Sequence, residues 1–208
     1  MSNIVKPLLP ITVFMDYVCP FCYIGERRLA RLSESHDLRI NWCLLELHPE
    51  TPLQGRPTAQ LGYLGEQMRI LLADLDRLNK EEGIAVRDAD ITPNSHRALL
   101  LAEAAKEGSR ETFEKLHHAL FAAHFVEGRN LGDTEVLRSI ALNAGLRDET
   151  IERAWKEERY RYKLKQNKAN AALLNIPGTP TFLIGQWMIS GAVSGDELLE
   201  VASQLKWM

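Results

Sequence analysis

Two cysteines separated by two residues lie where a predicted strand meets a predicted helix, and this arrangement constrains the fold more than any other feature. The apolar, β-branched run over residues 11–15 is typical of a buried strand, and residues 24–32 have the apolar spacing of a helix. Cys19 and Cys22 therefore open a helix directly after a strand. Two sulfurs on a first helical turn can approach disulfide distance, and the helix N-terminus stabilises a thiolate on the first of them. The arrangement favours redox chemistry.

Two other interpretations of the cysteine pair remain open. Half of a zinc site would need further ligands at suitable spacing, but no second CxxC motif follows, and the three histidines of the central region do not supply one: His117, His118 and His124. The pair could also be two inert core cysteines. We predict no metal site, and we interpret the third cysteine, Cys43, as a packing residue on an apolar strand.

The composition limits the classes of function. The chain has 208 residues, 45% of them hydrophobic, and is long enough to bury a core. A net charge of −3 gives no reason to expect nucleic acid or an anionic membrane as a partner. No apolar run reaches 18 residues and no secretory signal is recognisable at the start, so we expect a cytoplasmic protein. In a reducing compartment, three cysteines argue for a catalytic pair rather than for a disulfide framework.

The two ends of the chain have the patterns of an α/β fold. A second strand over residues 38–47 completes a β-α-β unit with a parallel crossover. Near the C-terminus, residues 181–184 and 187–190 form a predicted hairpin around Gly185-Gln186, and a capping box at Ser194 begins a last helix. The order of these elements is β-α-β, then β-β-α.

The middle of the chain is predicted to be helical throughout. Helical periodicity covers five segments: 59–80, 94–106, 110–126, 134–143 and 149–174. Asn94, after a proline, is the expected N-cap of the second of these helices. We therefore expect one domain built from residues 1–57 and 175–208, and an all-helical insertion domain over residues 58–174.

These residues carry a resemblance to the thioredoxin superfamily. The element order, the motif Cys19-Pro20-Phe21-Cys22 and the segment Gly178-Thr179-Pro180-Thr181 before the third strand are typical of it. A thioredoxin-like fold with a large helical insertion is similar to the DsbA-like class. The segments Met15–Gly25, Glu46–Pro49 and Asn94–Ala98 resemble the FrnE-like branch. That branch is similar in turn to 2-hydroxychromene-2-carboxylate isomerases and kappa-class glutathione transferases.

The resemblance implies roles for the cysteines and for the proline loop. Cys19 would be the exposed nucleophile, and Cys22 would be the resolving thiol beneath it. Thr179 and Pro180 would bind substrate, with a cis bond before Pro180 that leaves the backbone of Thr179 free to pair with an extended peptide. Without the resemblance, an ordinary trans proline at a strand start would be expected at this position.

Six further residues are candidates for substrate contact or tuning. Pro20 and Phe21 resemble the Pro-aromatic pair of glutaredoxins more than the Pro-His pair of DsbA, which implies a mostly reduced thiol pair in the cytosol. Asp16 could move a proton or tune the thiolate, or simply form a turn. Asn94 begins a helix that could line the cleft, where His96 and Arg97 would hold an anion such as a glutathione carboxylate. The alternative is that these side chains are solvated or bridging.

We predict an enzyme, a thiol-disulfide oxidoreductase of the DsbA family that acts on protein or small-molecule disulfides. Its expected partners are disulfide-containing proteins or peptides, with glutathione as a candidate co-substrate and no bound cofactor. One alternative is a glutathione-dependent isomerase or transferase of the 2-hydroxychromene-2-carboxylate isomerase or kappa type, whose members commonly carry serine at the position of Cys19. A non-catalytic peptide-binding module is the other alternative, and the intact cysteine pair disfavours it. The oligomeric state is left open.

Overall fold

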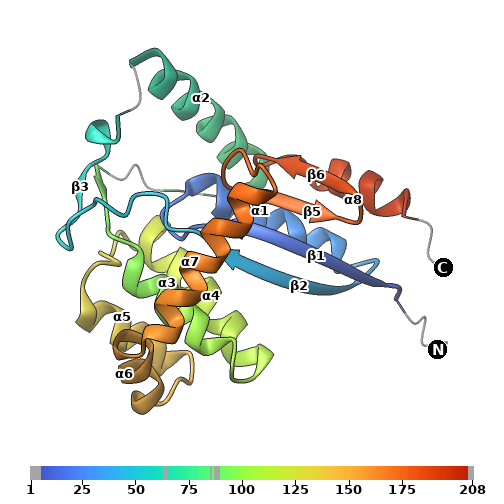
Figure 1. Ribbon diagram of the computed structural model, residues 1–208. Coiled ribbons are helices and arrows are strands. Elements are labelled where there is room, and N and C mark those ends of the chain that lie inside the picture. The colour runs from blue at the N-terminus through green and yellow to red at the C-terminus, as the bar shows by residue number, and fades with distance from the viewer. Residues whose placement is uncertain (1–5, 63–64, 85, 87–89, 206–208) are drawn as a thin grey trace.

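A four-stranded mixed sheet lies at the centre of the protein (Figure 1). The computed structural model describes the chain apart from residues 1–5, 63–64, 85, 87–89 and 206–208. The strand order is β2-β1-β5-β6, with bounds β1 Leu8–Met15, β2 Asp37–Leu44, β5 Thr181–Ile184 and β6 Trp187–Ser190. β1 pairs in parallel with β2 and antiparallel with β5, which pairs antiparallel with β6. The predicted β-α-β unit and the C-terminal hairpin are confirmed.

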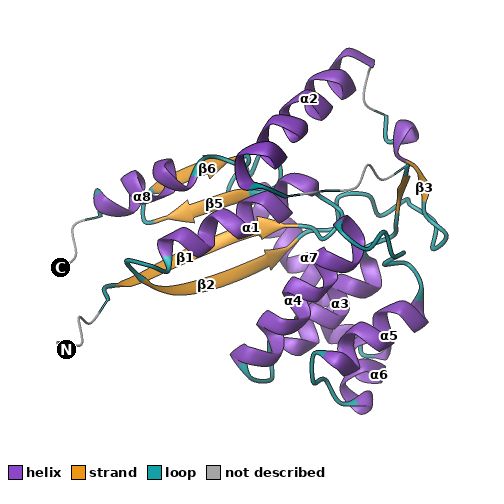
Figure 2. Ribbon diagram, turned by 180° about the vertical axis from the view of Figure 1, so that it is seen from behind, coloured by secondary structure: helices purple, strands orange, loops and turns teal. Residues whose placement is uncertain are grey.

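The central strand β1 has apolar side chains on both of its faces. Val13 and Met15 belong to the main hydrophobic core, whereas Phe14 packs with Cys43 and Ala171 in a smaller cluster. Because successive side chains of a strand point to opposite faces, the two clusters cover opposite faces of the sheet. Helices α1 (Pro20–Leu32) and α8 (Gly195–Ser203) pack against each other along the sheet (Figure 2). As predicted, Cys43 is buried in an apolar environment.

Most of the chain between β2 and β5 is helical. The bounds of the helices are α2 Gly65–Glu82, α3 His96–Ala105, α4 Arg110–Phe125, α5 Thr134–Asn143, α6 Asp148–Lys156 and α7 Glu158–Leu173. α3 is the centre of this group, because residues 98–105 are all buried and the helix contacts α4, α5, α6 and α7. The main core runs from the sheet into these helices. The division into two domains at residues 58 and 174 stays a prediction. Among the described helices, none has the length and apolar content needed to cross a bilayer.

The predicted helix over residues 149–174 is wrong, because the chain forms two helices there that meet at Glu157. The backbone of Glu157 is extended, with φ −79° and ψ 127°. On one continuous helix, the buried pair Ile151 and Ala154 would lie on roughly the opposite face from Tyr160, which is 1% exposed. The break reorients α7, so that both sets of side chains are buried.

Two further boundaries differ from the sequence prediction. Ser95, not Asn94, is the N-cap residue of α3, although the Asn94 side chain accepts a hydrogen bond from the backbone N–H of His96 at 3.0 Å. The expected helix over residues 59–80 is a short 3-10 turn, Thr58–Gln60, followed by α2. A small two-stranded sheet, β3 (Arg56–Pro57) with β4 (Ile91–Thr92), was not predicted. Two-residue strands carry too little periodicity to be recognised.

Helix α2 extends away from the rest of the molecule and is anchored near its C-terminal end (Figures 1 and 2). Among its described side chains, only Leu78 is buried. The anchor is Arg28 on α1, a side chain only 2% exposed, which donates to Glu82 at 2.7 Å and to Glu81 at 2.9 Å. The same guanidinium donates to the carbonyl oxygens of residues 192 and 193 at 2.6 and 2.9 Å. Arg28 therefore ties α1, α2 and the loop before α8 together.

Candidate active site

Cys19 lies at the N-terminal end of α1, after the turn that follows β1. It is the N-cap residue of the helix, and Pro20 occupies the first turn, where a proline loses no hydrogen bond. The backbone N–H of Cys22 donates to the carbonyl oxygen of Cys19 at 3.0 Å. The backbone N–H of Cys19 donates to the carbonyl oxygen of Asp16 at 3.2 Å. The strand, the turn and the helix thus place both thiols where the sequence predicts them.

The loop before β5 covers the first sulfur. The Cys19 thiol donates to the carbonyl oxygen of Thr179 at 3.4 Å, and the Thr179–Pro180 peptide bond is cis, as expected. Cys19 is only 6% exposed and Cys22 only 2%, so the expectation of an exposed nucleophile is wrong. Thr179, which follows Cys19 by 160 positions in the chain, lies against the sulfur and shields it from solvent.

The proline loop also packs directly onto α1. Gly25 lies one turn after Cys22, and a Cβ atom there would lie 3.3 Å from Pro180 Cγ and 2.9 Å from Phe182 Cζ. Glycine therefore permits the close approach of helix and loop. Phe21 is partly exposed, as is Pro20, so the dipeptide between the sulfurs can meet a molecule from outside.

The two thiols have opposite pKa shifts. Burial alone would raise the pKa of Cys19, but the hydrogen bonds that the Cys22 and Thr179 side chains can donate to its thiolate outweigh burial and lower that pKa. Burial, together with the hydrogen bond to Cys19 and the charge there, raises the pKa of Cys22 well above its usual value. The buried Thr179 hydroxyl has no hydrogen-bond partner among the described residues, which leaves it available to donate to the thiolate. Cys19 is therefore the better nucleophile, and Cys22 holds its proton.

Asp16 is a fully buried carboxyl group beside this pair. Its Oδ2 accepts hydrogen bonds from the backbone N–H of Leu47 at 2.8 Å and from the Ser95 hydroxyl at 3.1 Å. Its Oδ1 accepts from the backbone N–H of Val18 at 3.4 Å. Burial outweighs these hydrogen bonds and raises the pKa of Asp16 from 3.8 to about 7. Ser95 was not predicted as a site residue, although its place beside Asn94 in the sequence was a signal.

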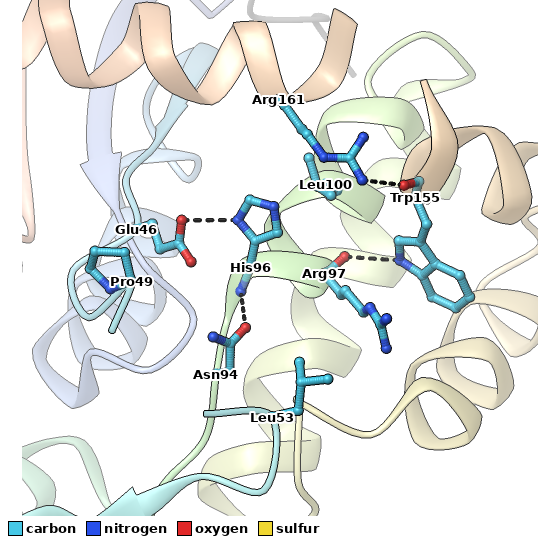
Figure 3. Close-up of a pocket in the computed structure, with 9 residues that line it drawn as sticks. All are labelled: Glu46, Pro49, Leu53, Asn94, His96, Arg97, Leu100, Trp155 and Arg161. Carbon is cyan, nitrogen blue, oxygen red and sulfur yellow. Dashed lines mark hydrogen bonds and ion pairs between the residues drawn. The ribbon is translucent and has the colours of Figure 1, made fainter. Parts of the chain in front are cut away.

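Asn94 and Arg97 line a separate pocket of about 510 Å³ (Figure 3). Within the described part of the chain, no hydrogen bond or ion pair joins either residue to a cysteine. Sequence reasoning missed the pocket residues Trp155 and Arg161, because they come from α6 and α7 and no local pattern connects them to α3. Among the residues that the structure describes, no cluster of three or more His, Cys, Asp or Glu could hold a metal ion.

A helix that begins with a CxxC motif after a sheet strand, with a cis-proline loop beside the first sulfur, defines a thioredoxin-fold thiol site. Residues 10–202 match the model of the DsbA-like thioredoxin domain. The chain belongs to the DsbA-like thioredoxin family.

Solved structures with the same fold include a probable oxidoreductase, a disulfide reductase and an isomerase. A protein described as a probable DsbA oxidoreductase from Streptomyces coelicolor has a TM-score of 0.80 and 25% identity, covering 96% of this chain and 94% of its own. The cytosolic disulfide reductase DsbM from Pseudomonas aeruginosa, solved with glutathione, has a TM-score of 0.68 and 20% identity, covering 95% and 100%. A 2-hydroxychromene-2-carboxylate isomerase has a TM-score of 0.71 and 18% identity, covering 93% of each chain.

Proposed function

We propose that this protein is a thiol-disulfide oxidoreductase that uses Cys19 and Cys22 on disulfides of proteins, peptides or small molecules. The observation that carries the proposal is the geometry at the start of α1, where Cys19 is the N-cap residue, Cys22 lies in the first turn and the carbonyl oxygen of Thr179 lies 3.4 Å from the Cys19 sulfur. The pKa shifts, lowered for Cys19 and raised for Cys22, agree with this arrangement. Disulfide exchange requires one thiolate that attacks and one thiol that waits. Activation of bound glutathione by an isomerase would need only one group at the Cys19 position.

In the reductive direction, the Cys19 thiolate attacks one sulfur of the substrate disulfide, and the other substrate sulfur leaves as a thiolate. The product is a mixed disulfide between Cys19 and the substrate. Cys22 then loses its proton and attacks the Cys19 sulfur, which releases the second substrate thiolate and leaves a Cys19–Cys22 disulfide. Two electrons have passed from the cysteine pair to the substrate, and an external thiol must restore the pair.

The substrate is proposed to lie along Thr179 and Pro180, with Pro20 and Phe21 on its other side. The carbonyl oxygen of Thr179 already accepts from the Cys19 thiol at 3.4 Å, so a backbone segment bound beside it would be adjacent to the reacting sulfur. Pairing of a peptide backbone with an exposed extended segment is a common mode of recognition.

Asp16 is proposed as the group that tunes Cys19 and exchanges protons near the pair. Its ionised form disfavours the Cys19 thiolate by charge repulsion. With a pKa of about 7, the carboxyl group changes charge within the physiological range. A buried acid of this kind can accept a proton during the resolving step.

Glutathione is proposed as the thiol that reduces the pair, and the cytoplasm as the location. The description of the P. aeruginosa protein as a cytosolic disulfide reductase with glutathione supports both proposals. The cytosolic glutathione poise of about −220 to −320 mV would keep a pair of similar potential mostly reduced.

The test is thiol-dependent reduction of insulin with single-cysteine variants. Cys19→Ser should abolish the activity, and Cys22→Ser should sharply lower multiple turnover while it accumulates mixed disulfides, because attack remains possible without resolution. Cys43→Ser is the matched control, since this buried cysteine lies in a different cluster and should retain activity.

Trapping through Cys22 instead of Cys19 would reverse the assignment. The isomerase alternative wins if the unmodified protein exchanges no disulfides while Cys22→Ser keeps full activity in a glutathione-dependent isomerisation.

A further inference from the structure

The pocket beside α3 is a concave site whose lining includes neither cysteine. We call it the Arg97 pocket and define it by its lining residues: Glu46, Pro49, Leu53, Asn94, His96, Arg97, Leu100, Trp155 and Arg161. Its volume of about 510 Å³ lies in the range of small-molecule sites, roughly 300–1,000 Å³. Figure 3 shows that the segment after β2 forms one side and that Trp155 lies on the opposite side.

Arg97 supplies an unused positive charge at this pocket. Its backbone carbonyl oxygen accepts from the Trp155 indole N–H at 3.3 Å, which fixes the main chain. Its guanidinium makes no hydrogen bond or ion pair with any other residue in the described ranges, although the side chain is partly buried. A guanidinium carries five N–H donors in a planar fork, and the buried Arg28, by comparison, engages acceptors with all three of its nitrogens. The fork of Arg97 is available to a ligand.

The remaining charges leave the pocket positive. Arg161 is held by the carbonyl oxygens of Trp155 and Lys156 at the end of α6, and its closest carboxylate, that of Glu158, is 3.9 Å away. The one acidic lining residue, Glu46, is engaged at 2.9 Å by Nδ1 of His96. The pocket lining therefore contains two guanidinium groups and one carboxylate that already has a partner.

The guanidinium fork of Arg97 matches the geometry of a carboxylate. Phosphate sites at helix N-termini use free backbone N–H groups, but the N–H of His96 is already bonded to the Asn94 side chain at 3.0 Å. A guanidinium fork binds a carboxylate through two parallel hydrogen bonds without such help. Leu53 and Trp155 supply apolar surface for the rest of the ligand.

We propose that the Arg97 pocket binds a small organic carboxylate with an apolar body, whose carboxylate pairs with Arg97. This site goes beyond the proposed disulfide exchange and does not require the thiols. It does share two chain segments with them, because Leu47 and Ser95, the donors to Asp16, are sequence neighbours of the lining residues Glu46 and Asn94.

The test is calorimetric titration of the Cys19→Ser/Cys22→Ser protein with 3-phenylpropionate, and with its uncharged analogue 3-phenylpropanamide. The acid should bind saturably with one site per chain, and the amide should bind at least about tenfold more weakly, because it lacks the charge for the guanidinium. Arg97→Gln should weaken binding of the acid by about tenfold or more, equivalent to roughly 1.4 kcal/mol. Arg147→Gln is the matched control, since this arginine is 79% exposed and lies outside the pocket, and it should bind as the parent does.

Leu53→Glu is a second variant with little effect expected on folding, because the leucine is 44% exposed. It places a negative charge in the pocket wall and should also weaken binding of the acid. The proposal is overturned if the acid does not bind saturably, if the amide binds equally well, or if neither variant changes the affinity. The unmodified protein is titrated in parallel. Binding of the acid to that protein but not to the Cys19→Ser/Cys22→Ser protein would place the ligand at the thiol site instead. Because insulin reduction is measured separately, failure here leaves the disulfide-exchange proposal unaffected.

Discussion

Replacement of the buried carboxyl group by an amide, Asp16→Asn, should change how the stability of the protein depends on pH. The pKa of Asp16 is raised from 3.8 to about 7 in the folded protein, first of all by burial. Between these two values the folded state binds a proton that the unfolded state has lost, so the free energy of unfolding falls as pH rises and levels off above pH 7. At about 1.4 kcal/mol per pKa unit, the full loss is roughly 4 kcal/mol.

The assay is urea unfolding of Asp16→Asn and its parent at pH 5 and pH 8, both in the Cys19→Ser/Cys22→Ser background, so that no thiol of the pair titrates. Somewhat more than half of the full loss should fall between these two pH values, and the asparagine variant should lack that part. The absolute stability of the variant is not the readout, because an amide cannot accept every hydrogen bond that the carboxylate accepts from Leu47, Ser95 and Val18.

Asp76→Asn is the matched control, because this carboxylate is 65% exposed on α2. Its pH dependence should match that of the parent. The reasoning about Asp16 is refuted if the parent and Asp16→Asn lose the same free energy between pH 5 and pH 8. With both cysteines present, Asp16→Asn should also lower the pH midpoint of Cys19 alkylation by iodoacetamide, because the ionised carboxylate raises the pKa of Cys19.

Two further predictions concern buried or bridging ion pairs. Arg28→Leu should lower the free energy of unfolding by about 3 kcal/mol in urea titrations, because it leaves buried acceptors without a partner. Arg31→Leu, which removes a side chain that is 47% exposed, should lower it by less than about 1 kcal/mol. Equal losses in the two variants would contradict the role of Arg28 as the anchor of α2. The hydrogen bond to Glu26 raises the pKa of His118, so its stabilising contribution is complete below the unfolded pKa and is lost as pH rises through the folded pKa. His118→Gln should therefore lower the urea midpoint at pH 5.5 and leave it unchanged at pH 9, and an equal change at both pH values would count against this pair.

The local parts of the site could be predicted from the sequence because neighbouring residues determine them. A β-branched run followed by a CxxC motif with proline in the first turn places the thiols at a strand-to-helix junction, and the structure has them there. The same holds for the hairpin, where Gly185 adopts φ +58° in the two-residue turn. The position of Pro180 beside Cys19 was predicted only from the family resemblance, not from the residues alone.

The contacts between distant segments were decided only by the tertiary structure. Thr179 lies over Cys19, the donors Leu47 and Ser95 surround Asp16, and Arg161 reaches a pocket built on α3. None of these contacts leaves a periodic pattern in the sequence, because the partners are far apart along the chain. The pKa of Asp16 depends on burial by all of these elements together, so the sequence left its role open between a turn and a proton carrier. By itself the sequence therefore determined where the two thiols lie in the fold, and the packing of distant elements determined their exposure and their charge.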